Sequence, residues 1–117
     1  MICIVGRMAM QEPTFLVLTA LVGPPLHGYA IMQAVGALPG GAPLRPGTLY
    51  AALDRLSQEC LVEVAHEEPI GGGRVRRSYR LTDRGAATLR SETNRRQALT
   101  RAAARRLAQL DASPHTA

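Results

Sequence analysis

The feature that most constrains the fold is an apolar stripe in the segment that begins at Pro46. Its members recur at i, i+4, i+7 and i+11, as Leu49, Leu53, Leu56 and Cys60. This spacing is typical of an amphipathic helix that packs one face into a core. Pro46 suits the first turn, because its φ is fixed at a helical value and its missing N–H would have had no partner there. The segment therefore predicts a helix with one buried face.

Two shorter helices are predicted ahead of this segment. Apolar residues follow helical spacing from Glu12 to Val22, and residues 23–25, Gly-Pro-Pro, end that pattern. A second helical pattern runs from about His27 to Leu38 and stops at residues 39–41, Pro-Gly-Gly. Proline cannot continue the backbone hydrogen-bond ladder, so both boundaries are sharp.

Beyond residue 60 the apolar period changes from helical to alternating. Val62 and Val64 alternate with Glu63 and Ala65, a turn follows at residues 69–73, and residues 74–82 alternate again. Alternation on both sides of a turn predicts a two-stranded hairpin. Tyr79 and Leu81 share one face of its second strand, and the other face carries Arg76, Ser78 and Arg80.

A long, arginine-rich helix is predicted from about Arg84 to Leu110, with Thr82-Asp83 as its cap. A narrow apolar stripe runs along it, of a kind that buries against a partner helix. The predicted dimerisation residues on this stripe are Leu89, Leu99, Ala103, Leu107 and Leu110.

The charge of the chain is positive and unevenly distributed. The formal net charge is +5, and all fourteen basic residues are arginines. Residues 1–68 hold three arginines and six acidic residues, whereas residues 69–117 hold eleven arginines and three acidic residues. A basic surface favours an anionic partner such as nucleic acid. Arginine suits phosphate and guanine contacts, although a GC-rich genome would give the same preference.

The sequence offers no arrangement that would support catalysis. The three histidines are isolated, and Cys3 and Cys60 have neither a CxxC partner nor a histidine at ligand spacing. We therefore predict no catalytic residues, no cofactor, no metal site and no disulfide framework. The apolar stretch from Phe15 to Leu26 is too short to span a bilayer. The expected location is the cytoplasm, without membrane association.

The order of these elements is that of a winged helix-turn-helix, in which the third helix enters the major groove of DNA. The predicted fold is mainly α with a two-stranded β-wing and one long C-terminal dimerisation helix. The predicted organisation is an N-terminal extension at 1–9, a DNA-binding domain at 10–83, the helix at 84–111 and a tail at 112–117.

Two groups of residues are candidates for contact with DNA. Around the start of the third helix, on or near the face opposite its leucines, small, hydroxyl and charged groups are available: Arg45, Gly47, Thr48, Tyr50, Ala51 and Arg55. At the hairpin, three arginines follow the glycine triplet: Arg74, Arg76 and Arg77. The structural alternatives are that Gly47 and Thr48 only cap the helix, that Tyr50 packs on the second helix, and that the arginines and Glu67-Glu68 only solubilise the hairpin.

Three strings together resemble the PadR-type transcriptional regulators, over about residues 10–90. They are Leu26-His27-Gly28-Tyr29, the run from Pro46 to Leu56, and the run from Tyr79 to Gly85. The resemblance implies a homodimer on a palindromic operator, mostly acting as a repressor that a small-molecule effector releases. It also implies that Tyr29 contacts the DNA backbone. The single helix after the hairpin is typical of the shorter members.

The sequence thus predicts a sequence-specific, DNA-binding transcriptional regulator and not an enzyme. The alternative is a winged-helix module that binds another protein instead of DNA.

Overall fold

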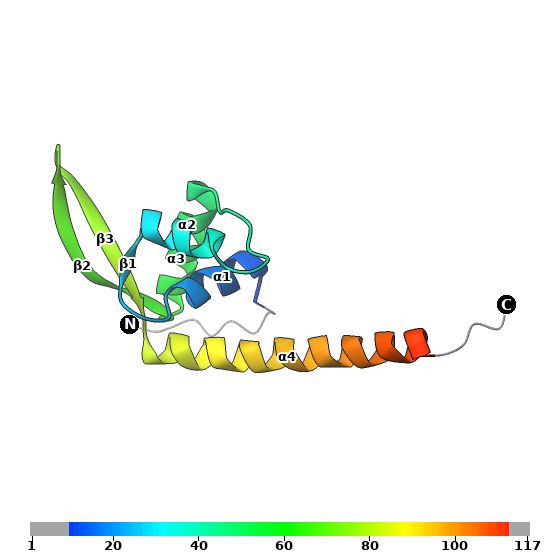
Figure 1. Ribbon diagram of the computed structural model, residues 1–117. Helices are drawn as coiled ribbons and strands as arrows, with labels where there is room; N and C mark the ends of the chain where they lie inside the picture. The colour runs from blue at the N-terminus through cyan, green and yellow to red at the C-terminus, as the bar shows by residue number, and fades with distance from the viewer. Residues whose placement is uncertain (1–9, 113–117) are drawn as a thin grey trace.

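The computed structural model describes residues 10–112 of the 117-residue chain. Three short helices form a cluster, and a long hairpin leaves it on one side. The C-terminal helix starts at the base of the hairpin and runs along the cluster, away from the hairpin (Figure 1). The elements in chain order are α1 (Glu12–Ala20), β1 (Leu26–His27), α2 (Gly28–Gly36), α3 (Pro46–Gln58), β2 (Val62–Gly71), β3 (Arg74–Leu81) and α4 (Asp83–Ala112). The extension predicted at 1–9 and all but the first residue of the predicted tail lie outside the described residues.

The core is aliphatic and draws on every helix. Leu49, Leu53 and Leu56 of α3 are fully buried, as their spacing predicts. They pack with Val17, Leu18 and Leu21 from α1, Ile31 and Val35 from α2, Leu61 and Val62 at the start of the hairpin, and Leu89 from α4. Because α3 lies at the centre of this cluster, its opposite face is left for solvent or a ligand.

The sheet has one strand more than the sequence predicts. The expected hairpin of β2 and β3 is present, and β1 adds to the free edge of β3 in the order β1-β3-β2. Leu26 pairs with Tyr79 and His27 with Ser78. Ser78 thus lies in the central strand and is only 5% exposed, unlike Arg76 and Arg80, with which it was predicted to share a face.

The second helix also begins one residue later than predicted. His27 is the N-cap of α2, and its Nδ1 accepts a hydrogen bond from the N–H of Ala30 at 3.3 Å. A side-chain acceptor at this position satisfies one of the free N–H groups of the first turn. His27 thus joins the sheet to α2.

α3 ends at Gln58, so Cys60, the last residue of the predicted apolar stripe, lies just beyond the helix. The N–H of Leu61 donates to the carbonyl of Leu56 at 2.9 Å, and that of Cys60 to Ser57 at 3.1 Å. These bonds form a Schellman cap, in which Cys60 takes a φ of 62°. Cys60 is also disulfide-bonded, contrary to the prediction. Disulfide formation depends on the distance between two Cα atoms in space, which cysteine spacing along the chain does not reveal.

The start of α4 packs on the chain that follows α3. The hydroxyl of Thr82 accepts from the N–H of Gly85 at 2.9 Å and donates to the carbonyl of Cys60 at 2.6 Å, so the predicted cap is confirmed. Gly85 is buried, and a Cβ there would overlap the carbonyl oxygen of Leu61. The close approach of the two backbones therefore requires glycine at position 85.

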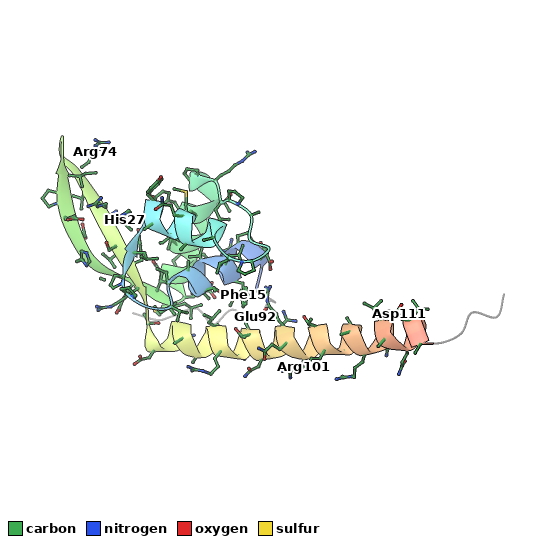
Figure 2. The ribbon with its side chains drawn as sticks, in the orientation of Figure 1. Phe15, His27, Arg74, Glu92, Arg101 and Asp111 are labelled. Atoms are coloured by element: carbon green, nitrogen blue, oxygen red, sulfur yellow. The ribbon has the colours of Figure 1, made fainter. Side chains whose placement is uncertain are left out.

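A second attachment joins α4 to α1 through charged groups. Glu92, only 9% exposed, accepts hydrogen bonds from Arg95 and Arg96 at 2.7 to 3.0 Å. Arg96 also donates to Glu12 of α1 at 2.6 Å and lies 4.0 Å from the ring centroid of Phe15. Figure 2 shows Glu92 and Phe15 facing each other where α4 passes α1. We call Glu12, Phe15, Glu92, Arg95 and Arg96 the α1–α4 junction.

The junction should make stability depend on acid pH. The hydrogen bond from Arg95, and then that from Arg96, lower the pKa of Glu92 from 4.5 to about 2 against the opposing effect of burial. Because the folded state lowers the pKa, the contribution of Glu92 is complete above pH 4.5 and is lost as the pH falls towards 2.

We expect Glu92→Gln to lower the free energy of unfolding by about 1–2 kcal/mol at pH 7, as loss of a charged hydrogen-bond partner does. The difference from the wild type should shrink between pH 4.5 and 2 in urea unfolding followed by circular dichroism. Asp111→Asn, on the exposed end of the same helix (Figure 2), is the control and should leave the profile unchanged. A difference that is constant over this pH range would contradict the assignment.

Candidate nucleic-acid interface

The face of α3 opposite its leucines is exposed along its whole length. Every candidate predicted on or just before this helix is solvent-accessible: Arg45, Gly47, Thr48, Tyr50, Ala51 and Arg55. Ala51 is the smallest of the side chains on the helix face, so a ligand surface can come close to the backbone there. The exposed face is thus small and polar at its N-terminal end and cationic at Arg55.

The N-terminus of α3 presents free donors. Its N-cap is Arg45, which makes no side-chain capping hydrogen bond. Gly47 and Thr48 lie inside the helix, so they are not its N-cap. Apart from the adjacent residues and the nearby helix backbone, no atom of residues 10–112 lies within 4 Å of a Cβ built at Gly47, so packing within this part of the chain does not require glycine there. Free N–H groups and the positive end of the helix dipole favour an anion such as phosphate at this end.

All three tyrosines of the chain line one open groove between the helices and the hairpin. Tyr29 comes from the start of α2, Tyr50 from α3 and Tyr79 from β3. The groove holds about 470 Å³, and its remaining lining residues are His27, Gly28, Ile70, Val75, Arg76 and Arg77. This tyrosine groove brings Tyr29, Tyr50, Arg76 and Arg77, all predicted as DNA contacts, to one place.

Tyr50 has a packing role as well as an exposed surface. Its hydroxyl lies over Gly28, where an added Cβ would overlap it. The structural alternative for Tyr50, packing on the second helix, therefore holds in part. The residue nevertheless stays 52% exposed, so its ring remains accessible from the groove.

The hairpin ends in a tight glycine turn. Gly71, Gly72 and Gly73 have φ values of 96°, 63° and 75°, which side chains other than glycine rarely adopt. Arg74 follows directly and lies at the tip (Figure 2). Among residues 10–112, no carboxylate lies within ion-pair distance of Arg74. Arg74 is therefore the wing arginine whose charge is fully available to a partner.

The other two wing arginines have carboxylate partners across the hairpin. Arg76 donates twice to Glu68, at 2.6 and 2.9 Å, and Arg77 lies 3.6 Å from Glu67. Both glutamates belong to β2 and were predicted only as solubilising residues. These pairs were missed because the register of a hairpin cannot be fixed from composition alone.

The apolar stripe of α4 divides into a buried part and an exposed part. Leu89 belongs to the core of its own chain, which differs from its predicted role in dimerisation. Leu99, Leu107 and Leu110 are each more than half exposed, and Ala103 between them is exposed too. This free half of α4 extends beyond the helical cluster (Figure 1). A row of exposed leucines on a protruding helix indicates an interaction surface.

Residues 10–112 contain neither a candidate metal site nor a membrane-spanning helix. No group of three or more His, Cys, Asp or Glu side chains could hold a metal ion there. None of the described helices is both long enough and apolar enough to cross a lipid bilayer.

The fold and this surface define a winged-helix protein with a long C-terminal helix. The family described as the transcriptional regulator PadR-like family matches residues 17–91, well over half of the chain. The chain belongs to this family, and the resemblance found in the sequence is confirmed. The family is one of transcriptional regulators.

Several solved structures share this fold. A PadR family regulator from Clostridium difficile aligns with a TM-score of 0.69 at 23% identity, over 81% of this chain and 97% of that one. One from Eggerthella lenta aligns with a TM-score of 0.68 at 30% identity, over 80% of each chain. Bacillus subtilis PadR, crystallised with operator DNA, aligns with a TM-score of 0.59 at 23% identity, over 67% of this chain and 44% of that one.

One curated relative is an uncharacterized 37.1 kDa protein in a transposon of Streptomyces fradiae, 40% identical over 87 residues. The match covers 74% of this chain but only 24% of that relative. The chain thus spans about a quarter of the length of the relative.

Proposed function

We propose that the protein is a sequence-specific DNA-binding regulator that inserts α3 into the major groove. One observation carries this proposal: α3 buries its leucines and leaves Thr48, Ala51 and Arg55 exposed beside an N-terminus without a side-chain cap. A helix of this kind can reach base edges with its side chains and phosphates with its N–H groups. The complex of Bacillus subtilis PadR with operator DNA supports the same role for this related fold.

The remaining contacts follow from the position of each element. Residues 10–83 would form the DNA-binding domain, with Arg45, Gly47 and Tyr50 near the phosphates and Tyr29 at the backbone. The wing would add Arg74 directly, and Arg76 and Arg77 once their glutamates are displaced. Contacts to phosphates position the protein on DNA but hardly distinguish one DNA sequence from another. Recognition of the bases would therefore fall to α3.

We further propose that two copies pair through residues 84–111. The exposed Leu99, Ala103, Leu107 and Leu110 need a partner, and none of the described residues of their own chain covers them. A symmetric pair would present two α3 helices to a palindromic operator, about 34 Å apart. From the family resemblance we propose a cytoplasmic repressor that a small-molecule effector releases.

The salt dependence of DNA affinity tests the first proposal. Each phosphate neutralised by the protein releases counterions, so log K should fall with log salt with a slope of about −0.9 per contact. Fluorescence anisotropy with a labelled duplex from the region upstream of the gene gives this slope directly. A flat line would contradict the proposal and would favour the protein-interaction module.

Arg55→Ala tests the role of α3. Loss of a base or phosphate contact should weaken binding by about 1–3 kcal/mol, or about 5- to 150-fold. Arg101→Ala removes the same charge from the free half of α4 (Figure 2) and is the matched control. Equal losses in the two variants would show that only net charge matters.

A further inference from the structure

Two of the three arginines near the wing tip already form ion pairs with glutamates of the hairpin. The antiparallel register places Glu68 opposite Arg76 and Glu67 opposite Arg77, on opposite faces of the hairpin. Arg76 directs its Nε and one terminal nitrogen at the same carboxylate oxygen of Glu68. The wing therefore carries three guanidiniums but has two carboxylates within 4 Å of them.

A phosphate that approaches this wing meets a competitor. To contact Arg76 through the same nitrogens, it must displace the carboxylate of Glu68, which then stays beside the phosphate as a like charge. The same applies to Arg77 and Glu67. All four side chains are about half exposed, so each pair is weak and can be broken by an anion.

We infer that Glu67 and Glu68 limit the DNA affinity of the wing by holding Arg77 and Arg76 in ion pairs that phosphate must displace. The inference rests on the proposed DNA-binding function and deepens it. It assigns the two acidic residues of the wing a defined part in setting affinity. Arg74, which has no such partner among the described residues, would make the wing contact that is not attenuated.

The sequence contains a matched control for these pairs. Glu63 faces Arg80 across the same hairpin, on the same face as the Glu68–Arg76 pair, with a separation of 2.8 Å and similar exposure. Arg80 lies four residues further from the tip than Arg76, or about 13 Å at 3.3 Å per residue. Glu63→Gln removes the same charge and the same kind of ion pair near the base of the wing.

The experiment compares Glu68→Gln, Glu67→Gln, the double variant and Glu63→Gln on a mixed-sequence 30-base-pair duplex. Contacts to phosphate do not depend on sequence, so no operator is needed. The double variant should bind about three- to tenfold more tightly at low salt, with a steeper salt slope. Glu63→Gln should bind like the wild type. Melting curves within a few degrees of the wild type confirm that all four variants are folded.

Three other outcomes would contradict the inference, and the third would also contradict the proposed function. If the wild type binds and the double variant binds equally or more weakly, the glutamates do not restrain the wing, and this inference alone fails. If Glu63→Gln tightens binding as much as Glu68→Gln, net charge explains the gain, and the inference also fails. If the wild type shows no salt-dependent binding to any duplex, the proposed function fails together with the inference.

Discussion

Gly85→Ala should lower the free energy of unfolding by about 3 kcal/mol or more, which would lower the melting temperature by roughly 15 °C. The added Cβ would overlap the carbonyl oxygen of Leu61, which is backbone and cannot rotate away. Relief requires α4 to move off the end of α3, and this would break the hydrogen bonds of Thr82 to both segments. Thermal unfolding followed by circular dichroism at 222 nm measures the effect.

Gly36→Ala is the matched control for this prediction. Gly36 ends α2, and a Cβ built there would meet no other atom of the described residues within 4 Å, its own helix backbone and adjacent residues aside. Alanine at this position should be neutral or stabilise by up to about 1 kcal/mol, because it restricts the unfolded chain and favours helix. If Gly85→Ala melts close to the temperature of Gly36→Ala, the close approach of α4 to Leu61 is not a constraint on the fold.

The second large effect is expected on the free half of α4. Leu99→Glu together with Leu107→Glu should convert the proposed dimer to a monomer at micromolar concentration, because two charges would enter an apolar contact. Affinity for a palindromic duplex should then fall about 100-fold or more, since the two half-sites are no longer bound by linked domains. Light scattering after size-exclusion chromatography gives the mass, and anisotropy gives the affinity.

The control for the double variant uses the same helix. Ala108 is exposed one residue after Leu107, so it projects about 100° away around the helix axis. Ala108→Glu should keep both the mass and the affinity of the wild type. A monomeric wild type would refute the proposed pairing, and a dimeric double variant would place the contact elsewhere.

The parts of the fold that could be predicted are those with a strong local period. The leucine stripe of α3 extends over about two turns, and the alternating strands continue on both sides of a glycine turn. Such patterns arise because one face of each element is buried. In contrast, β1 has only two residues and therefore no period, and it forms because the edge of β3 is available to it.

The candidate site was predictable to a similar extent. The exposed face of α3 follows from its buried face, since the two lie on opposite sides of one helix. The ion pairs of the wing depend on the register, which is shifted by irregularities between Val64 and His66 and between Pro69 and Gly71. The α1–α4 junction joins residues more than eighty positions apart, and no pattern in the sequence connects them.

The placement of the three tyrosines has a practical consequence. The chain has no tryptophan, so its intrinsic ultraviolet emission comes from tyrosine alone. Because Tyr29, Tyr50 and Tyr79 all line the same groove, every intrinsic fluorophore of the molecule reports on that one surface. A ligand that enters the groove should alter the emission of the whole protein, and one that binds along the free half of α4 should leave it nearly constant. The unlabelled protein thus contains its own optical sensor of where a ligand binds.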